Sequence, residues 1–297
     1  MAVTVDWLGC ATYRLAVDGL VIYLDTYIDR PSTAPAVGTT VAEVTEADFA
    51  LIGHSHWDHI AGADVIAKHT GATVIGSFET ARLLREAGVP DEQLWATQGG
   101  ERFRLSETVT VRAFPSLHSC IWSRAAAPGT AVTGDYGVTK NERTARMAER
   151  RARRSGDPSE AGRELRELLA SNGGGPDDGG ALDYLIETPH GSVFFADSMG
   201  YFSGVLQRTR ADVAILAAAG RGNIDGEPVQ GAVEDFIARQ VELIQPRRVL
   251  LSHHDNFSGI PDSPDLTDMS PVRDVLARLA PHVELLEVEL GGSVRLL

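Results

Sequence analysis

The sequence predicts an α/β fold. Apolar runs of strand length alternate with segments that carry the helical period of about 3.6 residues. This alternation occurs once on either side of a basic segment in the middle of the chain. In both halves, acidic and histidine residues come directly after strand ends, where open α/β folds place their functional sites. We therefore expect one domain over residues 1–297, with two similar halves that face each other.

The composition is ordinary for a globular protein, with 43% hydrophobic and 23% charged residues. The formal net charge of −14 disfavours a nucleic-acid-binding surface, because phosphate backbones attract clustered Lys and Arg. Two cysteines, Cys10 and Cys120, are too few for a disulfide framework. The N-terminus lacks the features of a signal peptide, and no window approaches about 18 consecutive apolar residues. We expect a cytoplasmic protein with a small-molecule substrate, no membrane span and no nucleic-acid partner.

The first half is expected to consist of short strands and two helices. Asp18-Gly19 has the chemistry of a hairpin turn, and the prolines and glycine between Asp25 and Thr45 indicate a loop. Gly88 ends the second helix. The predicted strands are Thr4–Leu8, Tyr13–Val17, Leu20–Leu24, Phe49–Ile52, Thr73–Ile75 and Thr108–Phe114, and the predicted helices are Ile60–Lys68 and Glu79–Ala87.

The second half repeats this alternation after residue 180. A turn at Thr188–Gly191 separates its first two strands. The predicted strands are Leu182–Glu187, Ser192–Ala196, Val213–Ala218, Arg248–Leu251, His282–Leu290 and Ser293–Leu297, and the predicted helices are Val229–Ile244 and Pro271–Leu279.

Residues 138–180 interrupt the pattern and are predicted to form a flexible, helical, basic insertion. Nine Lys/Arg against six Asp/Glu give Lys140–Leu168 a net charge of +3, so the remaining chain carries −17. Helices are expected over Ala145–Arg154 and Glu160–Ala170, followed by the glycine-rich linker Ser171–Gly180. The segment is either a solvated helical face or a mobile lid over an active site, and a basic lid would suit an anionic substrate.

The stretch HSHWDH carries the clearest functional signal. On an extended strand end, His54, His56 and Asp58 project from one edge, while His59 reaches a neighbouring point. Gly53 lets the backbone pack closely beneath them. Imidazoles and carboxylates are ligands that zinc, iron and manganese accept. Because four such groups exceed what one tetrahedral ion needs from one loop, the spacing predicts two metals.

Four later residues are ambiguous when they are considered singly. His118 follows a strand and could be structural, and Asp197 could be an ordinary residue at a strand end. His253 and His254 are adjacent candidates after another strand.

The order of these motifs resembles the metallo-β-lactamase superfamily over nearly the whole chain. HSHWDH resembles its H-x-H-x-D-H signature, His118 in PSLHS matches its third histidine, and Asp197 in FFADS matches its metal-bridging carboxylate. LLSHHDNF resembles the last histidine segment of the lactonase and phospholipase-D-like branch and favours His253 as the ligand over His254. WLGCATYRL resembles the opening W-L-G-H-A-T of that branch, with Cys10 in place of the histidine.

The resemblance implies a four-layer αββα sandwich with two divalent metal ions at one edge. Zinc is the first expectation, with iron or manganese as alternatives. The implied ligands are His54, His56 and His118 for the first ion, Asp58, His59 and His253 for the second, and Asp197 as the bridge.

The expected activity is hydrolysis of an ester, lactone, amide or phosphodiester by a water that two metals activate. Asp58 would orient that water and accept its proton. A di-iron redox protein on the same fold is an alternative, but redox relatives commonly carry H-x-E-x-D, and His56 favours hydrolysis. A nuclease is a further alternative that the acidic chain disfavours and the basic insertion keeps open. A binding module with a degenerate site is disfavoured by the full ligand set.

Overall fold

Two sheets carry most of the strands in the computed structural model, which describes residues 2–155, 162–164, 166–167 and 177–297. The first sheet contains, in spatial order, β17 (Ser293–Arg295), β1 (Thr4–Trp7), β2 (Tyr13–Val17), β3 (Leu20–Leu24), β4 (Phe49–Leu51), β5 (Thr73–Gly76) and β6 (Leu94–Ala96). The second contains β16 (Glu284–Leu286), β15 (Arg248–Ser252), β12 (Val213–Ala217), β10 (Gly191–Ala196), β9 (Leu182–Thr188), β8 (Thr110–Pro115) and β7 (Arg102–Arg104). A small third sheet contains β11 (Gly200–Tyr201), β13 (Asn223–Ile224) and β14 (Glu227–Pro228).

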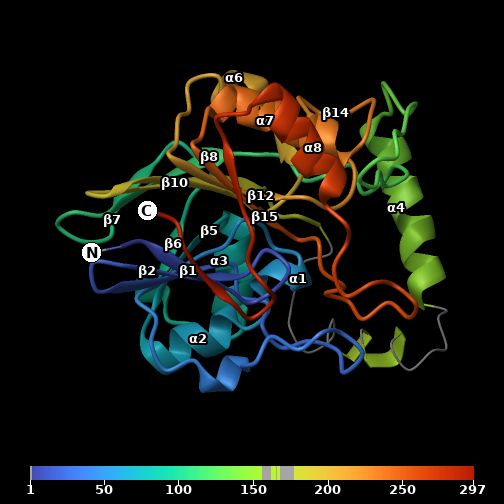
Figure 1. The fold of residues 1–297 in the computed structure, drawn as a ribbon. Coiled ribbons are helices and arrows are strands. Elements are labelled where there is room, and N and C mark those ends of the chain that lie inside the picture. The colour runs from blue at the N-terminus through green and yellow to red at the C-terminus, as the bar shows by residue number, and fades with distance from the viewer. Residues whose placement is uncertain (1, 156–161, 165, 168–176) are drawn as a thin grey trace.

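Helices cover the outer faces of both large sheets (Figure 1). On the first sheet lie η1 (Val41–Glu43), α2 (Ala63–Thr70) and α3 (Phe78–Glu86), with η2 (Asp91–Gln93) leading into β6. On the second lie α6 (Ser203–Leu206), α7 (Val233–Ile244) and α8 (Ser270–Leu279). The structure also contains the helices α1 (Trp57–Ile60) and α4 (Lys140–Ser155).

Strand alternation builds the layers. In β10, Val193 and Phe195 face the core between the sheets, whereas Phe194 and Ala196 face the helices. Trp7 and Tyr13 enter the same inter-sheet core from the first sheet. The four-layer αββα architecture is therefore confirmed.

The boundary between the two halves differs from the prediction. β7 and β8 precede the basic insertion but belong to the second sheet, because β8 pairs with β9 across it. The halves thus divide between β6 and β7, and the insertion lies within the second half. The last strand, β17, returns to the first sheet and pairs with β1, so the two chain ends lie near each other in Figure 1.

Several predicted elements are shorter or broken. The helix expected over Ile60–Lys68 begins later, as α2 at Ala63. Ile60 ends the short helix α1, Ala61 leaves the helical region with ψ of 131°, and Gly62 adopts a left-handed backbone with φ of 87°. The helix expected from Val229 begins at Val233, where the Asp235 side chain accepts a hydrogen bond from the Ala232 amide. The strand expected over His282–Leu290 is confined to β16. Strands β6 and β7 and the small third sheet were not predicted.

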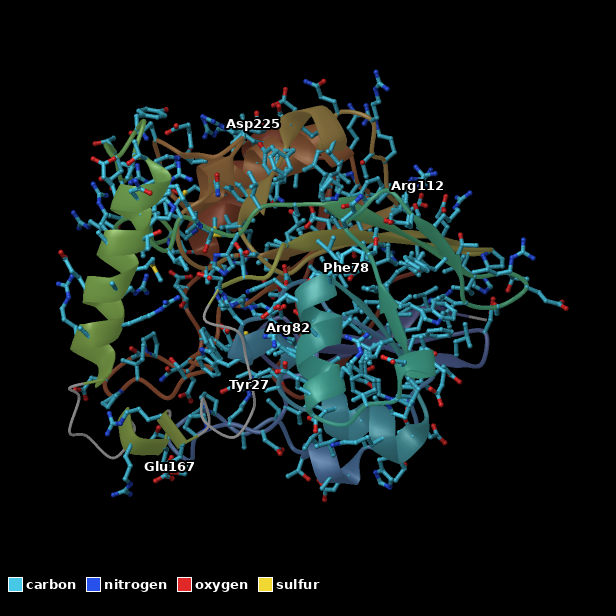
Figure 2. All side chains as sticks on the ribbon, turned by 180° about the vertical axis from the view of Figure 1, so that it is seen from behind. Tyr27, Phe78, Arg82, Arg112, Glu167 and Asp225 are labelled. Carbon is cyan, nitrogen blue, oxygen red and sulfur yellow. The ribbon has the colours of Figure 1, made fainter. Side chains whose placement is uncertain are left out.

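The basic insertion contains α4, which covers the helix expected over Ala145–Arg154. Residues 162–164 and 166–167 of the second expected helix are helical, and its other residues lie outside the described part of the chain. Most of the predicted linker Ser171–Gly180 also lies outside it. Figure 2 shows α4 along one edge of the molecule, where Arg143 stacks on Trp122 with 4.4 Å between the guanidinium carbon and the ring centroid.

Across the described residues, no helix combines the length and the apolar character needed to cross a bilayer.

Candidate metal centre

The predicted site residues come from strand ends that meet at one edge of the two sheets. β1, β3 and β4 of the first sheet share one direction, and so do β8, β10 and β15 of the second. The loops after these strands therefore converge. Two groups of side chains form there: the imidazole group of His54, His56 and His118, and the mixed group of Cys10, Asp58, His59 and His253.

The imidazole group brings three ring nitrogens together. His54 Nε2 lies 3.0 Å from His56 Nδ1, which lies 3.1 Å from His118 Nε2. The outer nitrogens of two rings have acceptors, because His54 Nδ1 faces Asp197 Oδ2 at 2.6 Å and His118 Nδ1 faces the Ser119 carbonyl at 2.9 Å. Those contacts assign the single proton of each neutral ring to Nδ1 and leave Nε2 as a lone pair. His56 Nδ1 carries at most one proton, which it can donate to only one of the two Nε2 atoms. The other Nε2 lone pair is left without a donor in the group, so the three nitrogens fit a cation.

Burial and neighbouring charge keep most of these imidazoles neutral. Burial, reinforced by the nearby His54, lowers the pKa of His118 to about 4. Burial and the charges of His54 and His118 hold the pKa of His56 well below its usual value. Burial also acts to lower the pKa of His54, but the charge and hydrogen bond of Asp197 outweigh it and raise that pKa. Neutral imidazole is the form that binds metal.

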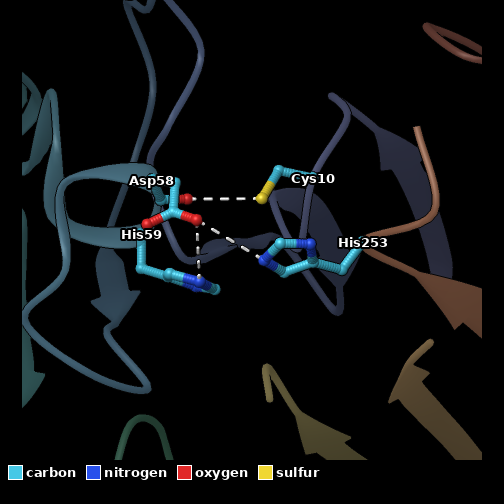
Figure 3. Close-up of side chains that lie close together, drawn as sticks. All are labelled: Cys10, Asp58, His59 and His253. Atoms are coloured by element: carbon cyan, nitrogen blue, oxygen red, sulfur yellow. Dashed lines mark hydrogen bonds and ion pairs between the residues drawn. The ribbon is translucent and has the colours of Figure 1, made fainter. Parts of the chain in front are cut away.

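The mixed group surrounds the carboxylate of Asp58 (Figure 3). Asp58 Oδ2 lies 3.8 Å from His59 Nε2 and 3.6 Å from His253 Nε2, and the thiol of Cys10 completes a set whose ligand atoms all lie within 4.8 Å of one another. Tetrahedral zinc with bonds of about 2.0–2.1 Å to nitrogen and oxygen places those atoms about 3.3 Å apart. A small contraction of the group would therefore enclose an ion.

Two buried carboxylates support the rings from behind. Asp25 Oδ2 lies 2.7 Å from His59 Nδ1, and its Oδ1 accepts the Gly53 amide at 2.9 Å. Asp197 Oδ2 contacts Nδ1 of His54 at 2.6 Å and Nδ1 of His59 at 3.3 Å, so it connects the two groups. A side chain at Gly53 would place its Cβ 2.1 Å from Asp197, which is why this close approach requires glycine. Such outer carboxylates fix the ring orientation of metal-binding histidines.

The structure brings all seven predicted site residues to this edge and separates His253 from His254. The His254 ring instead stacks on Trp7 at 4.8 Å. Two residues of the site were missed, Cys10 and Asp25. Cys10 had a signal, since it occupies the histidine position of the W-L-G-H-A-T opening, whereas Asp25 follows β3 with no local pattern to single it out.

The site is open on one side. Asp58 and His253 keep 14% and 13% of their side-chain surface exposed, whereas His54 and His59 are buried. An aromatic wall borders the mixed group, in which Tyr27, Trp57 and Phe257 contact one another. Among the described residues, the mixed group is thus buried apart from the exposed fractions of Asp58 and His253.

The chain is similar to known proteins in sequence and in fold. Residues 21–148 match the family described as the beta-lactamase superfamily domain. The chain is 24% identical to a UPF0173 metal-dependent hydrolase of Caldivirga maquilingensis over 293 residues, which cover 98% of this chain and 96% of that protein. Igni18, a metallo hydrolase from Ignicoccus hospitalis, matches with a TM-score of 0.61 at 16% identity, over 99% of this chain and 98% of Igni18. CmlA, a diiron beta-hydroxylase from Streptomyces venezuelae, matches with a TM-score of 0.57 at 14% identity, over 99% of this chain and 54% of CmlA.

Proposed function

Because the chain belongs to the metallo-β-lactamase superfamily, we propose that it is a cytoplasmic metal-dependent hydrolase with two metal ions, zinc foremost. The proposed substrate is a small ester, lactone, amide or phosphodiester. The observation that carries the proposal is the pair of adjacent ligand groups, which Asp197 connects. Two divalent ions bound there would acidify water and polarise the carbonyl or phosphoryl oxygen of the substrate.

Three residues would hold each metal ion. His54, His56 and His118 would hold the first ion, and Asp58, His59 and His253 the second. Asp197 contacts both groups and is proposed to bridge them, while Asp25 orients His59 through its Nδ1.

Asp58 is the proposed catalytic residue. Burial acts to raise its pKa, but the charges of His59 and His253 and the hydrogen bond from His253 hold that pKa well below the usual value. The carboxylate is therefore ionised, lies on the solvent side of its group and has an oxygen available to orient a water and accept its proton.

The insertion 138–180 is proposed to be a lid that favours anionic substrates. Its C-terminal end lies against the metal-binding loop, because the Ser55 amide donates to the Asp178 carbonyl at 2.8 Å. Arg151 of α4 lies 3.7 Å from Asp177, which places a cationic side chain beside this contact. Substituting Arg151→Gln should raise KM for anionic substrates and leave KM for neutral ones unchanged, since one exposed charge contributes about 1 kcal/mol or less. If Arg151→Gln left KM for anionic substrates unchanged, or raised KM equally for both substrate types, the lid would be contradicted.

A redox function is the alternative, because a diiron beta-hydroxylase shares the fold. Position 56 is histidine, where redox relatives of this superfamily commonly have glutamate, and the imidazole group offers only nitrogen ligands. Nuclease activity is disfavoured by the net charge of −14.

The test is a panel of generic ester, lactone and bis-nitrophenyl phosphate substrates with the zinc-loaded protein. We expect hydrolysis of at least one class, lost in His118→Ala. His69→Ala is the matched control, because this exposed histidine of α2 lies outside both groups and should leave activity intact. Activity that survives in His118→Ala would contradict the proposal.

A further inference from the structure

We propose that Cys10 is a thiolate ligand of the second metal, which makes the mixed group a sulfur-containing site that favours zinc over manganese. This inference rests on the proposed two-metal function and concerns a residue for which the resemblance implies no role. Cys10 is fully buried, and its Sγ belongs to the same close set as Asp58, His59 and His253. Figure 3 shows its side chain pointing toward these residues from the turn between β1 and β2.

The backbone at Cys10 is held in a conformation that aims its thiol at the group. Its φ of 49° is left-handed, which a residue with a side chain rarely adopts and which is concentrated at functional sites. Three hydrogen bonds hold it: its amide donates to Asp255 Oδ1 at 2.9 Å, and its carbonyl accepts from the Trp7 indole at 3.1 Å and from the His253 amide at 2.7 Å.

The His253 contact couples two members of the mixed group directly. His253 is also left-handed, with φ of 61°, so two adjacent strained residues present an imidazole and a thiol to the same carboxylate. The Cys10 thiol also donates a weak hydrogen bond to the Asp58 backbone carbonyl at 3.4 Å.

Two buried side chains behind Cys10, those of Asp255 and Arg30, hold the turn between β1 and β2 in place. Asp255, which anchors the Cys10 amide, forms a buried ion pair with Arg30 at 2.7 Å. The Arg30 guanidinium lies over Gly9, where an added Cβ would approach it to 1.9 Å. A change of backbone conformation at Cys10 would break the buried hydrogen bond from its amide to Asp255, a carboxylate that the ion pair with Arg30 holds in place.

The chemistry of the ligand predicts the metal preference. Thiolate is a soft ligand that zinc accepts readily, whereas manganese favours carboxylate and water oxygen. Binding would displace the thiol proton to solvent and form a metal–sulfur bond. Cys120 offers a matched control, because it is buried elsewhere, 3.8 Å from the Gly222 carbonyl, and belongs to neither ligand group.

Cobalt substitution tests the proposal. With two equivalents of cobalt, the wild-type protein and Cys120→Ser should show an intense near-ultraviolet sulfur-to-cobalt charge-transfer band, and Cys10→Ser and Cys10→His should lack it. Loss of an outer-shell partner already weakens metal binding about 10- to 100-fold, so Cys10→Ser should weaken the second cobalt by at least that factor and leave the first unchanged.

A measurement on the wild-type protein keeps the test independent of how the variants fold. X-ray absorption of the zinc-loaded protein should show a sulfur shell at about 2.3 Å. Two bound ions with no sulfur shell and no charge-transfer band would overturn the Cys10 proposal alone. A sulfur signal in a protein that hydrolyses nothing would uphold it and overturn the proposed function instead. Failure to bind a second ion would overturn both.

Discussion

The imidazole group and the mixed group lie side by side but are built differently. The imidazole group has three chemically identical ligands, and His56 Nδ1 lies 3.0 Å from the Nε2 of His54 and 3.1 Å from that of His118. The mixed group has three chemical types of ligand at wider spacing, with 3.6 and 3.8 Å between its nitrogen and oxygen atoms. It draws them from the β1–β2 turn, α1 and the loop after β15, and two of its members have left-handed backbones. Each group joins two residues of the HSHWDH stretch to residues from distant loops, His118 in the imidazole group and Cys10 and His253 in the mixed group. Only the mixed group varies its ligand type, so it is where this chain can tune its metal.

Removing the metals should have the largest effect and should reveal which group fills first. Activity is expected to fall to background after chelation, and the first equivalent of added zinc should enter the imidazole group and restore little of it. Metal in excess should also stabilise the fold, by about 4 kcal/mol at 1,000 times Kd. Titration with zinc, followed by activity and scanning calorimetry, checks both. Full activity in the stripped protein, or complete recovery with one equivalent, would contradict the two-group account.

Asp58→Asn should have the next largest effect, because it acts on the mixed group alone. The amide cannot accept a proton, so kcat is expected to fall by about 10²–10⁴-fold, the range for loss of a general base. The imidazole group should keep its metal, which elemental analysis of the variant measures. A kcat within twofold of wild type would exclude a role for Asp58 in proton transfer.

Substituting Asp25 or Asp197, the carboxylates that support the histidine rings, should cause smaller losses, of metal affinity, and these losses should differ between the two groups. Of the proposed ligands, Asp25 contacts His59, whereas Asp197 contacts His54 and His59. Asp25→Asn should therefore weaken the second ion by about 10- to 100-fold and spare the first, and Asp197→Asn should weaken both by at least that factor. Isothermal titration of each stripped variant measures this. If Asp25→Asn weakened both ions equally, the two groups would not be separable.

The sequence predicted the layers and the local part of the site. His54, His56, Asp58 and His59 lie within six positions, so their closeness in sequence brings them to one edge. The extended conformation expected through Asp58 was wrong, because helix α1 begins at Trp57 and turns Asp58 and His59 toward the mixed group, while His54 and His56 precede the helix. His118, Asp197 and His253 could be nominated only as residues after strands, and the resemblance joined them to the cluster. The structure places them at one edge because the strands that precede them share one direction.

The missed features depend on contacts between distant segments. Cys10 is aimed by Asp255 and Arg30, which no periodicity connects to it. β6 and β7 have three residues each, too few to display a strand period. The helix from Ile60 was predicted as continuous because Gly62 costs a helix only about 1 kcal/mol in propensity, whereas in the structure Ala61 is already non-helical and Gly62, with a left-handed backbone, precedes α2.

The smallest effect is expected from substituting His254, the residue next to His253 of the mixed group. His254 stacks on Trp7 and lies outside both groups, so His254→Ala should leave the metal content intact and destabilise the fold by about 0.5–1.5 kcal/mol, the usual range for an aromatic pair. Chemical denaturation with elemental analysis measures both. If His254→Ala lost an ion and His253→Ala kept both, the ligand would be His254.

The central claim is that this chain holds two metals in two adjacent groups, and elemental analysis of the wild-type protein purified from metal-replete cells tests it most directly. The account predicts about two transition-metal ions per chain, mainly zinc, as in other two-metal hydrolytic sites. A stoichiometry near zero, or one that stays at a single ion when zinc is supplied in excess, would contradict it.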